Sequence, residues 1–324
     1  MQPPVNQMAN SLSSTESPTE NYAFVMNVGH LTGADTFDLA PGHVLRRATA
    51  DEVAFIKQTI GRYAPIPHNQ SQHLWERRLP YPGGWLEILP QEDWRYFVVS
   101  FTGTNTTIAE LIGALDLSSL ELEVGFTAVD FGGHNYTVIS IPDRLFHTLN
   151  HAGQNKSFFV EVCAEDVAEI RRIHAQLQSR DSDNRNIQNL VLQLGQLKGL
   201  PFTSPLRFLG YFAILESLLT HTPKKSDPYE SITRQITVKL ALLDHRFPRG
   251  IEYAPFGGAS PKTVWSKMYD YRSRVAHGDG FELVETLKVL KSPDDALKLV
   301  RETVKAVIRQ LLSEPQLLRD LRDC

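Results

Sequence analysis

Four dipeptides in the second half of the chain place a proline directly after a serine or an aspartate, and each begins a run with helical periodicity. They are Ser204-Pro205, Asp227-Pro228, Ser260-Pro261 and Ser292-Pro293. Ser and Asp are preferred N-cap residues, and Pro is favoured at the first helical position because the N–H that it lacks would have no partner there. With a further amphipathic stretch at 186–200, this pattern predicts five helices and therefore a helical bundle.

The first half of the chain carries strand signals as well as helical ones. Strands are predicted where aromatic and β-branched residues cluster or alternate with polar ones, at 94–101, 120–129 and 136–141. Thr49 and Glu52 form a capping box before an amphipathic helix, and residues 107–116 are also helical in pattern. The expected fold class is therefore α+β, with an N-terminal mixed α/β domain followed by an all-α bundle.

Composition and periodicity divide the chain into four expected parts. Residues 1–20 are polar and rich in Pro, Ser, Asn and Gln, so they cannot bury enough apolar surface to fold and are expected to form a disordered tail. The α+β domain is expected at 21–150, a linking strand and helix at 151–184, and the helical bundle at 185–324.

Charge is distributed unevenly along the chain. Residues 1–150 hold 8 Lys and Arg against 16 Asp and Glu, whereas residues 151–324 hold 25 against 21. A basic second half permits contact with nucleic acid, although a solvated helical surface gives the same balance.

Cysteine usage and hydropathy bear on the compartment. Cys163 and Cys324 are the only cysteines, so the sequence offers neither a disulfide framework nor zinc-ligand spacing. The first residues lack the charged segment and following apolar segment of a secretory signal peptide. No apolar run in the sequence is long enough to span a bilayer. We therefore expect a cytoplasmic protein that works without a membrane, a metal or another cofactor.

The third of the proline-initiated helices places a charge beside its apolar stripe. The stripe consists of Val264, Met268, Tyr271 and Val275. Arg272 lies only about 40° from the centre of this stripe, so its guanidinium must reach water or meet a carboxylate. Glu216 intrudes in the same way on the apolar face of the first of these helices, which predicts a pair of Glu216 with Arg272 or Arg234. Such a pair either belongs to a site or only sets the register of the bundle.

His277 comes at the end of the same helix, directly before Gly278, a residue type that commonly terminates helices. On an ideal helix its side chain would point outward, about 140° from Arg272. The two side chains can therefore converge only if the helix loosens at Gly278, or if two chains bring their helix ends together. Alternatively, a histidine at this position is simply a favourable partner of the helix dipole.

The residues within these helices resemble the HEPN superfamily, most closely its Apea-like branch of bacterial proteins. The resemblance covers about 185–312 and depends on three stretches in this order: RFLGYFAILESLL (207–219), SITRQITVKLALL (231–243) and MYDYRSRVAHG (268–278). It implies a helical bundle, often dimeric, with an Arg and a His a few residues apart. In many members this pair makes a metal-independent ribonuclease, whereas other members have lost activity and serve as binding or dimerising modules.

The resemblance maps the catalytic pair onto Arg272 and His277. It implies that the imidazole moves a proton to or from the RNA 2′-hydroxyl, near neutral pH. The guanidinium would hold the phosphate and stabilise the charge that develops on its oxygens. The implied products are a 2′,3′-cyclic phosphate and a 5′-hydroxyl.

Further candidates surround this pair. Ser273 follows the arginine, where the family often has Asn, Asp or His, and Glu216 matches an acidic position of the branch. Glu216, Ser273 and Arg234 are therefore expected to support the pair. Arg274 and Lys267 are candidates for contact with RNA phosphates, or else they are plain solvated charges.

The resemblance thus predicts a homodimeric endoribonuclease, a hydrolase that binds RNA and acts in antiviral defence or as a toxin. The N-terminal domain would then sense a trigger, select the substrate or restrain the nuclease through a regulatory partner. The alternative prediction is a non-catalytic HEPN module that uses the same bundle for dimerisation and for binding RNA or protein.

Overall fold

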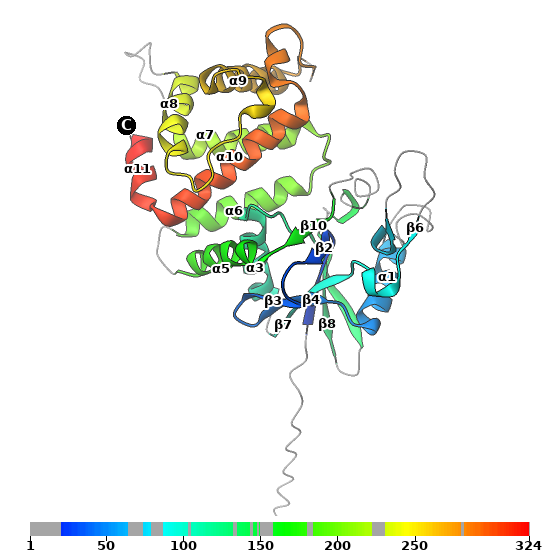
Figure 1. The fold of residues 1–324 in the computed structure, drawn as a ribbon. Coiled ribbons are helices and arrows are strands. Elements are labelled where there is room, and N and C mark those ends of the chain that lie inside the picture. The colour runs from blue at the N-terminus through cyan, green and yellow to red at the C-terminus, as the bar shows by residue number, and fades with distance from the viewer. Residues whose placement is uncertain are drawn as a thin grey trace, which may run out of the picture.

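Figure 1 shows the computed structural model of the chain. The structure describes residues 21–63, 74–78, 87–102, 105–131, 135–142, 145–147, 149, 158–179, 184–221, 231–279 and 282–323. The strands gather at one end of the molecule and the later helices at the other, so the fold is α+β as expected. The expected N-terminal tail, residues 1–20, lies outside the described residues.

A six-stranded antiparallel sheet forms the centre of the N-terminal part, with strand order β3-β4-β7-β1-β8-β9. Its strands are β1 (Asn21–Val25), β3 (Thr36–Ala40), β4 (His43–Arg47), β7 (Phe97–Phe101), β8 (Val124–Asp130) and β9 (Tyr136–Ser140). The three strands predicted from sequence are confirmed as β7, β8 and β9; each is shorter than predicted, and β8 ends one residue later than predicted. The strands of residues 21–47 were not predicted, and they include the central strand β1.

Two shorter pairings accompany this sheet. The linking strand expected after residue 150 is β10 (Val160–Val162), which pairs in parallel with β2 (Val28–Leu31). A second two-stranded pairing joins β5 (Arg77–Arg78) and β6 (Glu87–Ile88). Short 3₁₀ turns flank this pairing, η1 (Leu74–Glu76) and η2 (Gln91–Asp93).

Both faces of the central strand are covered, which explains why β1 is buried along its whole length. Tyr22 and Phe24 point to one face and pack with Ile56 and Ile60 of α1 (Ala50–Tyr63). Alternate residues such as Ala23 face α3 (Asn105–Leu117) and α5 (Ala164–Gln178) on the other side. The expected capping box of α1 is present, because the Thr49 backbone N–H donates to Glu52 over 2.7 Å and the Glu52 N–H donates to Thr49 Oγ1 over 3.3 Å.

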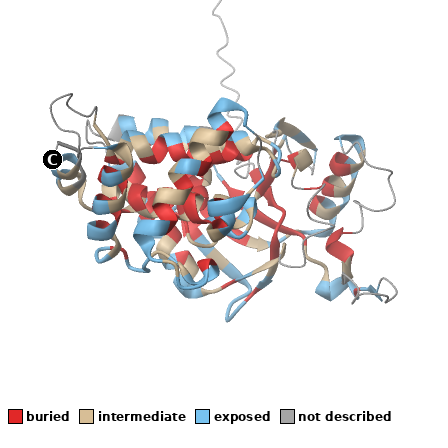
Figure 2. Ribbon diagram, turned by 90° about the horizontal axis from the view of Figure 1, so that it is seen from above, coloured by how far each residue is buried: buried red, intermediate tan, exposed pale blue. Residues whose placement is uncertain are grey.

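Helices α3 and α5 lie between the sheet and the helical bundle (Figure 1). On one side, α3 contributes Leu111 to the core beneath the sheet, and α5 contributes Ile170. On the other side, Leu117 of α3 and Ile173 of α5 belong to the core of the bundle. Buried residues consequently run through both parts of the molecule (Figure 2). The helix expected in the linking segment is α5, and it is packed into both cores.

The bundle itself consists of the helices that follow residue 183 and that share one apolar core. They are α6 (Asn184–Lys198), α7 (Pro205–Leu219), α8 (Ile232–Asp244), α9 (Pro261–His277), α10 (Pro293–Ser313) and α11 (Pro315–Asp323). The 3₁₀ turns η3 (Ala254–Phe256) and η4 (Glu285–Leu290) precede α9 and α10 respectively.

Three of the predicted serine–proline helix starts are confirmed, at α7, α9 and α10. The side chains of Ser260 and Ser292 accept hydrogen bonds from backbone N–H groups in the first turn, whereas that of Ser204 makes no such bond. The fourth dipeptide, at 227–228, lies outside the described residues. Helix α8 instead has Ser231 as its N-cap, with the side chain accepting from the backbone N–H of Arg234.

Candidate functional site

Arg272 and Glu216 form an ion pair between α9 and α7. The Arg272 Nη2 group donates to Oε2 of Glu216 over 3.1 Å, and the Arg272 and Glu216 side chains are 33% and 16% exposed respectively. Of the two arginine partners considered for Glu216, the structure therefore selects Arg272. An arginine has five N–H donors, so this bond leaves others that can reach an anion from solvent.

Aromatic contacts hold the same two helices together. The rings of Phe208 on α7 and Tyr271 on α9 have centroids 4.8 Å apart, and those of Phe212 and Tyr269 are 6.2 Å apart. Tyr271 directly precedes Arg272 in the chain and is buried. These contacts stabilise the local helix packing, so the guanidinium is presented from a rigid element.

His277 lies at the last position of α9 and is exposed. The helix ends there because Gly278 adopts the left-handed conformation, with φ of 78°, and the next residue's N–H donates back to the Arg274 carbonyl over 3.0 Å. The helix therefore does not loosen at Gly278 to bring the two side chains together. Within the described part of the single chain, the His277 ring makes no hydrogen bond or ion pair, and Arg272 is held by Glu216 instead.

The remaining candidate residues differ in exposure and in the partners that they bind. Lys267 is bound to Asp270 one turn away, over 2.8 Å, and Arg274 reaches the carbonyl of Asp279 over a long 3.5 Å. Ser273 is half-buried beside Arg272. Arg234 is exposed in the first turn of α8, and within the described chain it forms no ion pair with Glu216. Of these candidates, all of which the structure describes, only Glu216 forms a hydrogen bond or an ion pair with Arg272.

A second group of charged residues, which the sequence analysis did not single out, joins the sheet domain to the bundle. Lys305 of α10, only 2% exposed at its side chain, contacts Glu121 over 3.0 Å, and Arg301 contacts the same carboxylate over 3.4 Å. Lys198 of α6 contacts Asp116 over 2.8 Å and Glu123 over 3.0 Å. The acidic first half and the basic second half of the sequence therefore meet at this contact, so part of the basic excess serves the interface between them.

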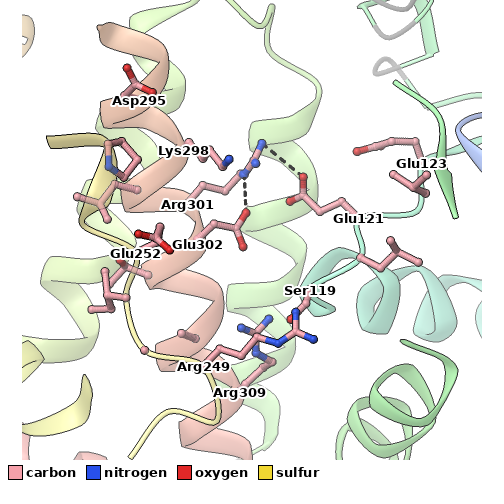
Figure 3. Close-up of a pocket in the computed structure, with 18 of the residues that line it drawn as sticks. Ser119, Glu121, Glu123, Arg249, Glu252, Asp295, Lys298, Arg301, Glu302 and Arg309 are labelled. Atoms are coloured by element: carbon pink, nitrogen blue, oxygen red, sulfur yellow. Dashed lines mark hydrogen bonds and ion pairs between the residues drawn. The ribbon is translucent and has the colours of Figure 1, made fainter. Parts of the chain in front are cut away.

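Beside these ion pairs lies a cavity of about 700 Å³, lined by both parts of the molecule (Figure 3). Glu121 comes from the segment before β8, Arg249 from the segment after α8, and Arg301 from α10. The only sequence signal for this cavity was the uneven charge of the two halves of the chain, which does not identify the surface that α10 would face.

Among the described residues, no cluster of His, Cys, Asp and Glu side chains could hold a metal ion. The described helices also include none that is both long and apolar enough to cross a membrane. Comparisons with protein-family models, with curated proteins and with solved structures find no match to this chain. The HEPN resemblance accordingly stays a prediction made from the three sequence stretches.

Proposed function

We propose that this chain is a metal-independent endoribonuclease of HEPN type, acting as a homodimer with Arg272 and His277 as catalytic residues. The observation that carries the proposal is the ion pair of Arg272 with Glu216 over 3.1 Å, five residues before an exposed His277 on the same helix. Glu216 orients the guanidinium, and the unused N–H donors can bind a phosphate.

A second copy of the chain would bring the His277 of one subunit close to the Arg272 of the other. Arg272 and His277 lie about 140° apart around an ideal helix, so one α9 does not direct both at one phosphate. Helix α8 packs beside α9 and exposes Val238 and Leu242, which are 49% and 55% exposed and four residues apart on one face. An apolar face beside the α9 helix supports association of two copies there.

In this dimer the reaction would need only the RNA, the two side chains and water. The imidazole of His277 takes the proton of the 2′-hydroxyl as its oxygen attacks the phosphorus, and Arg272 stabilises the charge on the phosphate oxygens. The P–O5′ bond breaks, the leaving 5′-oxygen takes a proton from water, and the protonated His277 returns its proton to the hydroxide that remains. The products are a 2′,3′-cyclic phosphate and a 5′-hydroxyl.

The test is cleavage of end-labelled RNA by the purified protein in EDTA, with Arg272→Ala and His277→Ala as the variants. Arg246→Ala and His245→Ala provide matched controls, because they remove an exposed Arg and an exposed His at the end of α8. The proposal expects cleavage by the wild type and both controls, loss in the two site variants, and cyclic phosphate ends on the product. Cleavage that persists in both site variants, or that EDTA abolishes, would contradict it.

A non-catalytic module is the second candidate, and one observation favours it. In the single chain Arg272 is already satisfied by a carboxylate, and an Arg–Glu pair between packed helices can serve only to set their register. This alternative expects dimerisation and binding of RNA or protein without cleavage. Binding that survives His277→Ala, in a protein that cleaves none of the RNA substrates offered, would support it over the nuclease.

A further inference from the structure

The cavity between the sheet domain and the bundle has the size and the walls of a small-molecule site. Its volume of about 700 Å³ falls within the range of roughly 300–1,000 Å³ that is usual for ligand pockets. One face of α10 forms its floor, because the lining residues recur at helical spacing: Asp295, Lys298, Leu299, Glu302, Thr303, Ala306 and Arg309. The cavity is separate from the proposed catalytic pair, neither member of which lines it.

The carboxylates around this cavity already have partners. Arg301 holds both Glu121 and Glu302, the latter over 3.2 Å (Figure 3). Lys305 also holds Glu121. Glu123 is held by Lys198 over 3.0 Å. The last two are bound locally, since Asp295 accepts from Ser292 over 2.6 Å and Glu252 accepts from the backbone N–H of Ala254 over 3.0 Å. The acidic side chains are therefore committed within the protein.

Two cations of the cavity are not committed in this way. Arg249 and Lys298 are exposed, and within the described part of the chain they make no hydrogen bond or ion pair. Arg249 lies beside Arg309 (Figure 3). These two also line a smaller adjoining cavity of about 220 Å³, together with Arg172. Burial lowers the pKa of Arg309, and repulsion from Arg172 and Arg249 lowers it further. The attraction of Glu169 offsets only part of this shift. The unpaired charge facing the cavity is thus positive, as an anion requires.

The remaining walls are apolar, aromatic or polar without a partner. Phe158, Phe202 and Phe256 line the cavity. Thr303 also lines it, and its buried Oγ1 has no hydrogen-bond partner among the described residues. Arg207 does not line the cavity but lies over the Phe202 ring, with its guanidinium carbon 4.6 Å from the ring centroid and with Nε and Nη1 both buried and unpartnered in the described chain. Buried polar groups without partners are uncommon, and they indicate a missing hydrogen-bonding group nearby.

We propose that this cavity is a binding site for a nucleotide, with the phosphate held by Arg249 and Lys298 and the base placed against the phenylalanine rings. Arg309 adds positive charge beside the phosphate, although it already donates to the Leu117 carbonyl over 2.5 Å and pairs with Glu169 over 3.8 Å. A nucleotide combines in one molecule the anion and the flat apolar group that these walls can recognise. The ligand would contact the sheet domain and α10 at the same time, and would therefore stabilise their contact. The site needs neither Arg272 nor His277, so it stands or falls independently of the nuclease.

The experiment is isothermal titration calorimetry of the full chain with AMP, GMP, CMP and UMP, with their triphosphates, and with inorganic phosphate and adenosine. At least one of these nucleotides is expected to bind with a stoichiometry of one per chain. Its affinity should exceed that of phosphate or of the nucleoside by about tenfold or more, because the phosphate and the base bind together. Arg249→Ala combined with Lys298→Ala is expected to weaken nucleotide binding by about tenfold or more, since two charged contacts are lost.

The matched control combines Arg246→Ala with Lys262→Ala, which removes one exposed Arg and one exposed Lys outside the cavity. It is expected to leave nucleotide affinity unchanged, and thermal melting of both double variants verifies that they fold. Equal nucleotide affinity in the two double variants would overturn the proposal, as would a wild-type chain that binds none of the nucleotides. Binding of a hexauridylate RNA without binding of any mononucleotide would also overturn it, and would make the cavity part of an RNA-binding surface.

Discussion

The guanidinium of Arg272 is bound to the carboxylate of Glu216 over 3.1 Å, although the two residues lie 56 positions apart in the chain. Their helices, α9 and α7, also meet through the Phe208–Tyr271 contact. The pair is therefore part of the packing of the bundle as well as of the proposed site. Its two roles can be separated by measuring stability and activity on the same variants.

A double-mutant cycle with Arg272→Ala and Glu216→Ala is expected to give a coupling of about 1–2 kcal/mol in the free energy of unfolding. This exceeds the value for a surface pair and falls below that for a fully buried one, because the two side chains are 33% and 16% exposed. Urea denaturation measures it. The Arg246–Glu314 pair, with side chains 57% and 42% exposed, is the control and should give about 0.5 kcal/mol or less. Additive effects of Arg272→Ala and Glu216→Ala would show that the ion pair contributes nothing to stability.

Mixing the two inactive variants tests whether Arg272 and His277 act from opposite protomers. A heterodimer of Arg272→Ala and His277→Ala chains then contains one intact site and one doubly disabled site. After subunit exchange, RNA cleavage should return to about a quarter of the wild-type rate, because half the dimers are mixed and each has one working site. If both residues of a site came from one chain, the mixture would stay as inactive as its components.

Lys305→Ala is expected to destabilise the protein by about 3 kcal/mol, because it removes one partner of a buried charge contact. The side chain of Lys305 is buried and binds Glu121 across the junction of the two parts. Lys298→Ala, at an exposed position on the same helix, should change stability by no more than about 0.5 kcal/mol. Chemical denaturation of both variants provides the measurement, and similar values for the two would refute a structural role of the buried contact.

The effect of Lys305→Ala should also depend on pH. Burial by itself would raise the pKa of Glu121, but Lys305, Arg301 and Lys198 outweigh burial and hold that pKa well below its ordinary value of 4.5. A carboxyl with a lowered pKa contributes stability that is present above pH 4.5 and is lost as the pH falls below it. The stability difference between wild type and Lys305→Ala should therefore shrink in acid. A difference that stays constant from pH 7 to about pH 3 would contradict this account.

His174 predicts a separate dependence on pH. Burial lowers the pKa of His174 from 6.5, and the charge of His43, whose ring centroid lies 6.2 Å away, lowers it further. The attraction of Glu110 offsets only part of this shift. The unfolded chain therefore binds a proton more readily than the folded one, so stability should fall as the pH drops through 6.5. His174→Gln should lose less stability than the wild type between about pH 7.5 and 5.5, as measured by urea unfolding at each pH. The exposed His245→Gln is the control and should follow the wild type.

Short-range interactions explain which elements could be predicted from the sequence. Ser260 and Ser292 bind backbone N–H groups only three residues away, and Thr49 and Glu52 bind each other at the same spacing. Such contacts need no other part of the fold, and they identified the starts of α1, α9 and α10. The angular position of Arg272 and of Glu216 was likewise a local property of each helix, so the need for a pairing was predictable.

Residues 21–47 show where local patterns are insufficient. The central strand β1 is buried on both faces and therefore lacks the alternation that marks a half-exposed strand. Its partner β7 lies far along the chain, with Asn21 opposite Phe101. Pairing over such a separation depends on the completed sheet, which explains why β1 was not predicted.

The sequence by itself determined where most helices begin, that α9 carries an arginine at its apolar edge, and that the two halves of the chain differ in charge. Only the tertiary structure decided that Glu216 meets Arg272, and that Lys305 and Arg301 meet Glu121 beside a cavity. The physical reason is range. Helix caps and helical faces are set within a few residues, whereas an ion pair between helices forms only after packing has excluded water and brought distant charges together.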